Sequence, residues 1–452
     1  MLTGNFDDTQ YYFQAMKKTL LVLALTWIAS AAFCQQLQRR VYLGIRMENL
    51  TEDSKKIMGL GDLNGVLIRE VLPRSTAEAA KFKKGDILLS LDGAGVNSTQ
   101  SVLSVLAGKN GGQSFSYEIY REKKTIKGKA VFKTFPEEKY ADLDVEYTDS
   151  KSAIGMQRTI ITKPKTAGKK PVVAFIGGIG CYSLDMPMDT GRSEVQLMLR
   201  LSRAGFLCAR LEKPGMGDNA RHCKACNEVS FKEETDGYIA AVQALKARSD
   251  VDSNAVFIFG HSMGGVFAPL IAQQTALKGI IAYGTLGSNF IEYIAKTRRT
   301  IGEAYNMSPE ETDELVKDFC ECSGYYFVEK MSTAEAAKKK AVCGEYMGIF
   351  DLRSRAYNDE LYALNIPGIW KPFTGKALLV WGESDYISAK EDHQIISGAV
   401  NYYHKGNAEM ILVRSADHAM NTAAGFAESQ RGVGPYNPEV GKIILDWLKK
   451  QA

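Results

Sequence analysis

Short apolar runs recur along most of this 452-residue chain, but their spacing changes near residue 140. Between residues 40 and 135 the runs are separated by tight turns, which is the pattern of a small β-rich domain. From residue 140 onward the runs alternate with segments of helical period, which predicts a mostly parallel sheet flanked by helices. A chain of this length exceeds one ordinary core, so we expect a β-rich domain at 40–135 and an α/β domain at 140–452.

The β-rich part contains a distinctive order of elements. A strand at 65–71 is followed by a turn and a small-residue helix at 73–80, then by a Gly-Asp turn, an apolar strand at 87–91 and an Asp-Gly turn. A second helix fits 98–106, and the last strand fits 115–121. This order resembles a bacterial PDZ domain over nearly its whole length.

The PDZ resemblance implies a role for the segment that precedes these elements. Tyr42, Leu43, Gly44 and Ile45 would form the loop that in this family binds the C-terminal carboxylate of a peptide through backbone N–H groups. The peptide then adds as a strand beside the following segment. The alternative is that the domain only packs against the rest of the chain or orients it.

In the α/β part, helical spacing predicts a helix at 231–247, and apolar runs predict strands at 171–176, 205–211, 255–259, 279–283, 377–381 and 410–413. The strand pattern is absent between residues 288 and 373, where charged helical stretches occur at 309–319 and 334–340. A helical insertion at about 288–373 would lie over the strand ends as a cap.

A Gly-x-Ser-x-Gly motif at 260–264 directly follows one of these strands and precedes a helical segment. That context identifies Ser262 as a candidate nucleophile, because the serine of such a motif lies on a strained strand-to-helix turn flanked by glycines. A serine hydroxyl reacts only when a base removes its proton, so a histidine and an orienting carboxylate must accompany it.

Asp385 and His418 meet this requirement, since each follows the end of a predicted strand and they occur in the order acid, then base. Two other carboxylates lie nearby, but Glu383 is tight against its strand and Asp392 falls within a predicted helix. The remaining histidines lie in the motif itself or in loops and helices, at His222, His261, His393 and His404. We therefore expect a triad of Ser262, Asp385 and His418.

Attack on a carbonyl creates negative charge that two backbone N–H groups normally bind. Met263, directly after the nucleophile, would supply one of them. The other is expected from the glycine-rich loop at 177–181, where the sequence does not distinguish Gly178 from Ile179.

From about residue 140 to the end, the chain resembles the α/β-hydrolase superfamily, particularly its bacterial esterases and serine-aminopeptidase-like proteins. The motifs above and the glycine-rich segment 213–218 carry this resemblance. It implies cofactor-free hydrolysis of an ester, amide or thioester through an acyl-serine. Ile176 replaces the histidine of the lipases' H-G-G-G motif, and His261 replaces the glycine that proline-releasing peptidases have before the serine.

The resemblance therefore favours a small acyl ester as substrate. One alternative is a serine peptidase or aminopeptidase acting on a short peptide whose terminus the PDZ-like domain holds. Another is a catalytically inert peptide-binding protein.

Composition narrows the choice of partners. Hydrophobic residues make up 45% and charged residues 24% of the chain, and the formal charge of +4 is close to balance. With no basic stripe or block, nothing indicates nucleic acid or an anionic membrane surface. We expect no metal site either, because no His pair or second C-x-x-C completes Cys223 and Cys226.

The N-terminal 34 residues have the pattern of an extension and a cleaved signal peptide. A basic start at 16–18, an apolar run at 20–25 and small residues at 29–32 follow one another, which suggests that Met16 is the true start. Phe33 before Cys34 disfavours lipid attachment. We expect a secreted or periplasmic protein with no membrane span after cleavage.

Export makes the cysteines candidates for disulfides. Loops that follow neighbouring strands meet at one edge of the sheet, so Cys181 is expected to pair with Cys223 or Cys226. Within the cap, Cys320 or Cys322 is expected to pair with Cys343, while Cys208, in an apolar strand, is expected to stay a buried thiol.

Overall fold

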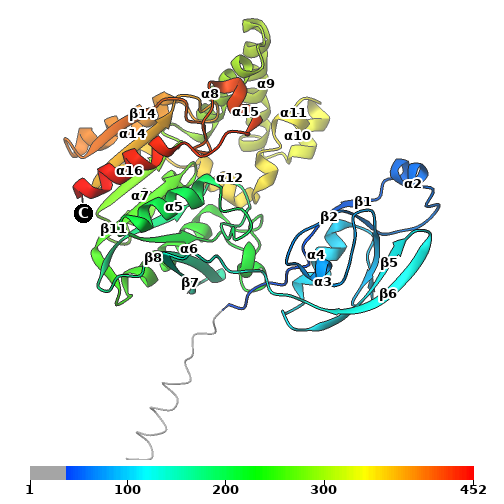
Figure 1. The fold of residues 1–452 in the computed structure, drawn as a ribbon. Coiled ribbons are helices and arrows are strands. Elements are labelled where there is room, and N and C mark those ends of the chain that lie inside the picture. Colours follow the sequence, from blue (N-terminus) through cyan, green and yellow to red (C-terminus); the bar gives the residue numbers. More distant parts are fainter. Residues whose placement is uncertain (1–36, 452) are drawn as a thin grey trace, which may run out of the picture. The chain divides into compact units, whose positions relative to one another are not determined.

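The computed structural model describes residues 37–451, and all of the elements below belong to the unit Gln38–Ala452. The expected signal peptide, with Met16 and Cys34, lies outside the described residues. The described chain forms two sheets, one built from residues before 132 and one from residues after 142 (Figure 1). None of the helices at 37–451 is long and apolar enough to cross a membrane.

The first sheet is antiparallel, with the strand order β1-β2-β3-β5-β6 and β4 paired to β3. Three helices accompany it: α2 (Glu52–Met58), α3 (Thr76–Ala79) and α4 (Thr99–Ala107). Its strands are β1 (Ile45–Asn49), β2 (Val66–Val71), β3 (Ile87–Leu91), β4 (Ala94–Gly95), β5 (Ser114–Arg121) and β6 (Lys124–Val131). Apolar side chains of the strands and helices form one small core of their own. Because β1 is an edge strand, one side of it is available to a further strand.

The segment expected to be the last strand, 115–121, is followed by β6, so that expectation is wrong. A two-residue turn, Glu122 and Lys123, joins β5 to β6, and both residues have positive φ angles of 50° and 61°. Hairpin turns of this geometry usually contain Asn-Gly or Asp-Gly, and neither is present here. The lysine-rich β6 also exposes most of its residues, so it lacks an apolar pattern.

The second sheet has eight strands in the order β14-β13-β12-β11-β9-β10-β8-β7. Strands β9 to β14 pair in parallel, and an antiparallel hairpin of β7 and β8 is added beside β10. Their bounds are β7 (Leu143–Ser152), β8 (Gly155–Pro164), β9 (Lys170–Ile176), β10 (Leu207–Leu211), β11 (Val251–His261), β12 (Gly279–Tyr283), β13 (Lys376–Gly382) and β14 (Ala408–Val413). The mostly parallel sheet expected from the sequence is therefore confirmed.

Helices cover both faces of this sheet (Figure 1). The core on one face includes side chains of α6 (Phe231–Lys246), α7 (Gly264–Ala272) and α14 (Lys390–Tyr403). The core on the other face includes side chains of α5 (Ser193–Arg203) and α16 (Pro438–Gln451). A short helix, α15 (Phe426–Arg431), precedes α16.

Between β12 and β13 the described chain contains helices and no strand. They are α8 (Phe290–Ala304), α9 (Pro309–Phe327), α10 (Thr333–Lys339), α11 (Cys343–Tyr346), α12 (Arg355–Tyr362) and α13 (Ile366–Trp370), with a 3₁₀ turn at Phe350–Leu352. A disulfide between Cys322 and Cys343 joins α9 to α11. Buried side chains of this segment belong to the same core as those of α6 and α7.

Candidate active site

Ser262 lies on the sharp turn between β11 and α7, with a positive φ of 54°. Residues other than glycine rarely adopt this conformation. The surrounding backbone also leaves no room for a side chain at either of the two glycines that flank the serine. A Cβ atom on Gly260 would lie 2.4 Å from the Gly264 carbonyl carbon, and one on Gly264 would lie 2.2 Å from the Ile176 carbonyl oxygen. The glycines of the motif are therefore required by close backbone contacts.

The turn is fixed by the last residue of β12 and the two residues that follow it. The Ser262 N–H donates to the Tyr283 carbonyl at 2.8 Å, and the Thr285 hydroxyl donates to the Ser262 carbonyl at 2.9 Å. Between them, a Cβ atom on Gly284 would lie 3.0 Å from Asp385 Oδ2 and 3.0 Å from His418 Nδ1. One three-residue segment thus makes hydrogen bonds with Ser262 and passes close to both Asp385 and His418.

Asp385 and His418 form a direct pair. Nδ1 of His418 lies 2.9 Å from Oδ2 and 3.1 Å from Oδ1 of Asp385, whose side chain is fully buried. The carboxylate also accepts hydrogen bonds from the backbone N–H groups of Ile387 and Ser388 at 2.9 Å and from the Ser388 hydroxyl at 2.5 Å. An ionised carboxylate only accepts, so Nδ1 of His418 carries the proton and Nε2 remains available as a base.

Opposing effects set the pKa values of this pair. Burial acts to lower the pKa of His418, but the Asp385 carboxylate raises it, and the net change is upward from 6.5. Burial acts to raise the pKa of Asp385, while His418 and the hydrogen bonds from Ser388 lower it, and the net change is downward. Both changes favour a charged carboxylate beside an imidazole that readily accepts a proton.

The competing residues have other partners. Glu383 is exposed, whereas Asp392, in the first turn of α14, is buried and accepts hydrogen bonds from the N–H groups of Gly287 and Ser288. His261 donates from Nε2 to the His418 carbonyl at 2.7 Å. Burial and the neighbouring His418 lower the pKa of His261 to about 4, so it stays neutral and holds the His418 backbone.

The other three histidines also make contacts away from the Asp385–His418 pair. Both ring nitrogens of His393 contact backbone, the Ala389 carbonyl and the Thr285 N–H. His404 contacts the Lys371 carbonyl at 2.9 Å through its ring. His222 follows a 3₁₀ turn, and its carbonyl accepts from the Met156 N–H.

The glycine-rich loop after β9 lies against Ser262. A Cβ atom on Gly178 would be only 3.3 Å from the Ser262 Cβ, so a larger residue would press on the nucleophile. The Gly178 N–H donates to the hydroxyl of Tyr182 at 2.9 Å. Within residues 37–451, the N–H groups of Ile179 and Met263 have no acceptor. Of the two candidates in this loop, Ile179 therefore has the unoccupied donor.

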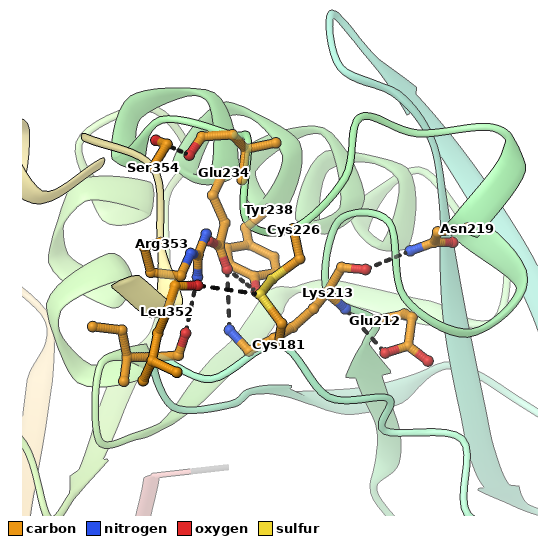
Figure 2. The surroundings of a disulfide bond; sticks show 12 residues. Cys181, Glu212, Lys213, Asn219, Cys226, Glu234, Tyr238, Leu352, Arg353 and Ser354 are labelled. Atoms are coloured by element: carbon orange, nitrogen blue, oxygen red, sulfur yellow. Dashed lines mark hydrogen bonds and ion pairs between the residues drawn. A yellow bond between two sulfur atoms is a disulfide. The ribbon is translucent and has the colours of Figure 1, made fainter. Parts of the chain in front are cut away.

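The same loop is anchored by a disulfide between Cys181 and Cys226 (Figure 2). This bond and the Cys322–Cys343 bond confirm the expected pairings and select one partner in each case. Cys223 is instead held by its backbone, which forms an isolated bridge with Gly155. Cys208 is a buried free thiol, as expected, and Cys223 and Cys320 are also free.

A buried cluster of charged side chains lies beside this disulfide (Figure 2). Glu234 of α6 pairs with Lys213 at 3.1 Å and with Arg353, and it accepts from the Tyr238 hydroxyl at 2.7 Å. Arg353 also donates to the Ile179 carbonyl at 3.0 Å. The helical segment between β12 and β13 is thereby joined to the glycine-rich loop.

Sequence reasoning missed this cluster and Tyr182. Burial lowers the pKa of Lys213, although Glu234 acts to raise it. Burial acts to raise the pKa of Glu234, but Lys213 and Arg353 act to lower it, and the net change is downward. The only signal in the sequence is that Lys213 follows the apolar strand at 207–211, where a charge would need a buried partner.

The four residues 42–45 line a groove to which residues of β1 and α4 also contribute. Within residues 37–451, the N–H groups of Leu43 and Gly44 have no acceptor, whereas the Tyr42 N–H donates to the Lys133 carbonyl at 2.8 Å. Ile45 is the first residue of β1 and pairs with Val71. Two free backbone donors thus directly precede the edge strand β1, which is the arrangement that carboxylate capture uses.

Comparison with known proteins agrees with the division of the chain into one domain around the first sheet and another around the second. Residues 41–129 match the PDZ domain family. The chain is 25% identical over 273 residues to Esterase EstD of Thermotoga maritima. The aligned region covers 59% of this chain and 58% of EstD. The chain is also 32% identical over 87 residues to a probable periplasmic serine protease, do/HhoA-like, of Haemophilus influenzae, which covers 19% of each protein. The chain thus spans less than two thirds of the length of either relative.

Among solved structures, Est1E from Butyrivibrio proteoclasticus, determined with bound ferulic acid, is 14% identical with a TM-score of 0.43 and covers 67% of this chain and 98% of Est1E. The sheet topology and the sequence matches together indicate which domains the chain contains. It carries a PDZ domain followed by an α/β-hydrolase domain that is homologous to an esterase.

Proposed function

We propose that the hydrolase domain is a serine esterase, with Ser262 as nucleophile, His418 as base and Asp385 as the acid that orients it. The observation that carries the proposal is the convergence of the strained Ser262 turn and the Asp385–His418 pair on the segment 283–285. Similarity to EstD supports hydrolysis, and supports an ester as substrate more than a peptide.

The proposed reaction has two acyl-transfer steps. Ser262 Oγ attacks the acyl carbon while its proton passes to Nε2 of His418, and the carbonyl π electrons move to oxygen. The tetrahedral intermediate collapses as the bond to the leaving alkoxide breaks and His418 protonates that oxygen. Water then attacks the acyl-serine by the same route, which releases the acid and restores Ser262.

Backbone donors would bind the oxyanion in both steps. The free N–H of Met263 follows the nucleophile directly, and the free N–H of Ile179 lies in the adjacent loop. Preorganised donors of this kind contribute about 10²–10³ each to kcat.

Ser262→Ala tests the nucleophile. We expect kcat on a short-chain aryl ester to fall by about 10⁴ or more, and labelling by a fluorophosphonate probe to disappear. Ser202→Ala is the matched control, since the hydroxyl of this buried serine donates to the Thr162 carbonyl and not to a residue of the proposed triad. Labelling that persists in Ser262→Ala would mean that another residue is the nucleophile.

The competing activity is peptide hydrolysis. The similarity to periplasmic proteases covers only 19% of this chain, so it gives the hydrolase domain no support as a peptidase. Comparing aryl esters with aminoacyl amides of the same acyl group separates the two activities. A higher kcat/KM on the amides would replace the esterase proposal with the peptidase one.

We also propose that the protein is exported. The two disulfides fit an oxidising compartment. The proteases that resemble its PDZ domain carry names that describe them as periplasmic. Mass spectrometry of the protein from fractionated cells should find a cleaved N-terminus outside the cytoplasm. An intact N-terminus in the cytoplasm with Cys181 alkylated would contradict export.

For the PDZ domain we propose capture of a peptide C-terminus at Leu43 and Gly44. Their free N–H groups and the edge strand β1 support this function, which is independent of the hydrolase chemistry.

A further inference from the structure

Tyr182 directly follows the glycine-rich loop 177–181, and its hydroxyl folds back onto the glycines of that loop. It accepts a hydrogen bond from the Gly178 N–H at 2.9 Å. It also lies against Gly177, where an added Cβ atom would be 2.6 Å from the hydroxyl oxygen. The Gly177-Gly178 pair therefore makes room for this phenol.

The phenol faces the same small space as the nucleophile. The position that a Cβ atom would take on Gly178 is 3.6 Å from Ser262 Oγ and 3.7 Å from Tyr182 Oη. The two hydroxyls thus flank one point beside the loop. A carbonyl attacked by Ser262 would place its oxygen in the region that Tyr182 borders.

The phenolic proton is available to such an oxygen. Within residues 37–451, the Tyr182 hydroxyl accepts from Gly178 but has no acceptor for its own hydrogen. Burial is the main cause that raises the pKa of Tyr182, so the group stays protonated. A phenol that accepts an N–H bond is polarised and becomes a better donor.

The loop holds Tyr182 firmly. The preceding residue, Cys181, is bound to Cys226, and the following residue, Ser183, donates to Glu212 at 2.6 Å. Oxyanion donors are effective when they need no reorganisation during the reaction, and anchors on both sides provide this.

We propose that the Tyr182 hydroxyl donates a hydrogen bond to the oxyanion, together with the N–H groups of Met263 and Ile179. This inference rests on the proposed function and adds a side-chain donor to it. No proton leaves Tyr182: the π electrons of the carbonyl move to oxygen as the Oγ–C bond forms, and the phenol stabilises that charge. The Gly178 N–H acts through Tyr182 by polarising it.

Tyr182→Phe tests the donor, and Tyr140→Phe is the matched control. Tyr140 is also half-buried, and its hydroxyl, like that of Tyr182, makes one hydrogen bond, which it donates to Glu138 at 3.0 Å. We expect Tyr182→Phe to lower kcat by about 10²–10³ with KM changed less than threefold and the melting temperature nearly unchanged. Tyr140→Phe should leave kcat within twofold.

A transition-state mimic distinguishes a hydrogen bond from Tyr182 to the oxyanion from a merely structural role of its side chain. A trifluoromethyl ketone forms an anionic adduct with a serine nucleophile, so its Ki should rise in Tyr182→Phe by about the factor by which kcat/KM falls. The Ki of an uncharged alcohol that resembles the product should not change. If both constants rise equally, the phenol shapes the pocket and the inference is wrong.

Other outcomes are equally decisive. An unchanged or higher kcat in Tyr182→Phe would mean that the phenol only occupies or blocks the Gly178 N–H, which overturns the inference while the esterase proposal stands. A wild-type protein that neither hydrolyses aryl esters nor reacts with fluorophosphonate overturns the proposed function itself.

Should Tyr182→Phe not fold, 3-fluorotyrosine at position 182 keeps the hydroxyl and its bond to Gly178. Its ¹⁹F resonance should shift when the trifluoromethyl ketone binds, and the shift should vanish in Ser262→Ala. No shift on adduct formation would contradict a contact between Tyr182 and the oxyanion.

Discussion

His418 is subject to opposing effects at the scale of a single residue. Burial disfavours the imidazolium, whereas the Asp385 carboxylate 2.9 Å away favours it. Burial is the largest single effect, but the charge and hydrogen bond of Asp385 together with the charge of Asp417 outweigh it, so the folded protein raises the pKa of His418 above 6.5.

This direction predicts the pH dependence of the reaction. His418 must be neutral to accept the Ser262 proton, and a raised pKa keeps it charged to a higher pH. We therefore expect kcat/KM to fall as the pH drops, with a midpoint above 6.5. A pH–rate profile of the purified protein with an aryl ester measures it, and a midpoint below 6.5 would contradict the assignment of His418 as the base.

Asp385→Asn should both slow the reaction and move this midpoint. The amide removes the negative charge that raises the pKa of His418 and favours the wrong tautomer, so kcat should fall by about 10⁴ and the midpoint should shift to lower pH. Glu383→Gln removes an exposed carboxylate two residues away and should change neither quantity. If Glu383→Gln were the damaging change, the acid would be misassigned.

At the scale of elements, the glycine-rich loop depends on contacts from distant parts of the chain. Cys226, Arg353 and Glu212 each hold a different residue between Ile179 and Ser183. A loop that must present donors to a developing charge gains from this constraint, because less ordering remains to be done in the transition state.

The two disulfides allow a matched comparison. Removing either one, as Cys181→Ser/Cys226→Ser or Cys322→Ser/Cys343→Ser, should lower the free energy of unfolding by about 2–5 kcal/mol. Only the first pair contacts the loop beside Ser262, so only its loss should reduce kcat, by about tenfold or more. Urea unfolding and ester hydrolysis measure the two effects, and equal losses of kcat would argue against a role for the loop.

Arg353 links the helical segment after β12 to the core of the hydrolase domain. Arg353→Met would remove one of the two cations that pair with the buried Glu234 and would free the Ile179 carbonyl. Breaking a buried ion pair costs about 3–5 kcal/mol, whereas an exposed pair contributes about 0.3–0.5 kcal/mol. Lys232→Met, in an exposed pair with Asp236, is the control. Similar free energies of unfolding for the two variants would contradict the importance of the buried cluster.

At the scale of the whole molecule, the PDZ domain makes a separate prediction. The groove beside β1 is lined by apolar side chains, among them Met47, Leu103 and Leu106. A fluorescent hexapeptide that ends in a hydrophobic residue with a free carboxylate should bind at least tenfold more tightly than its C-terminal amide. Anisotropy measures both, and equal affinities would rule out carboxylate capture.

Leu103→Glu should abolish this binding, and because Leu103 is 50% exposed the substitution should leave the domain folded. Val328→Glu, at an exposed apolar position outside the groove, is the control. Binding that survives Leu103→Glu would place the peptide elsewhere.

Local patterns were sufficient for much of the fold. Strands β9 to β14 were predictable because both faces of a parallel sheet are covered, which makes each strand a continuous apolar run. Strand β7, at the sheet's edge, was missed because most of its residues are half-buried or exposed. Strand β8 was missed because its buried residues include polar and charged ones, Gln157, Arg158, Thr159 and Thr162. Strand β6 was missed because it is mostly exposed.

The sequence by itself determined the candidate triad, because the Ser262 motif and the positions of Asp385 and His418 after strand ends are local features. Only the tertiary structure decided that Cys181 pairs with Cys226 and that the Tyr182 hydroxyl accepts a hydrogen bond from the Gly178 N–H. It also decided that Glu234 is buried between Lys213 and Arg353. These contacts join residues that are distant in sequence or that a loop brings together. Their geometry depends on how the strands and helices pack, and local sequence patterns do not contain that information.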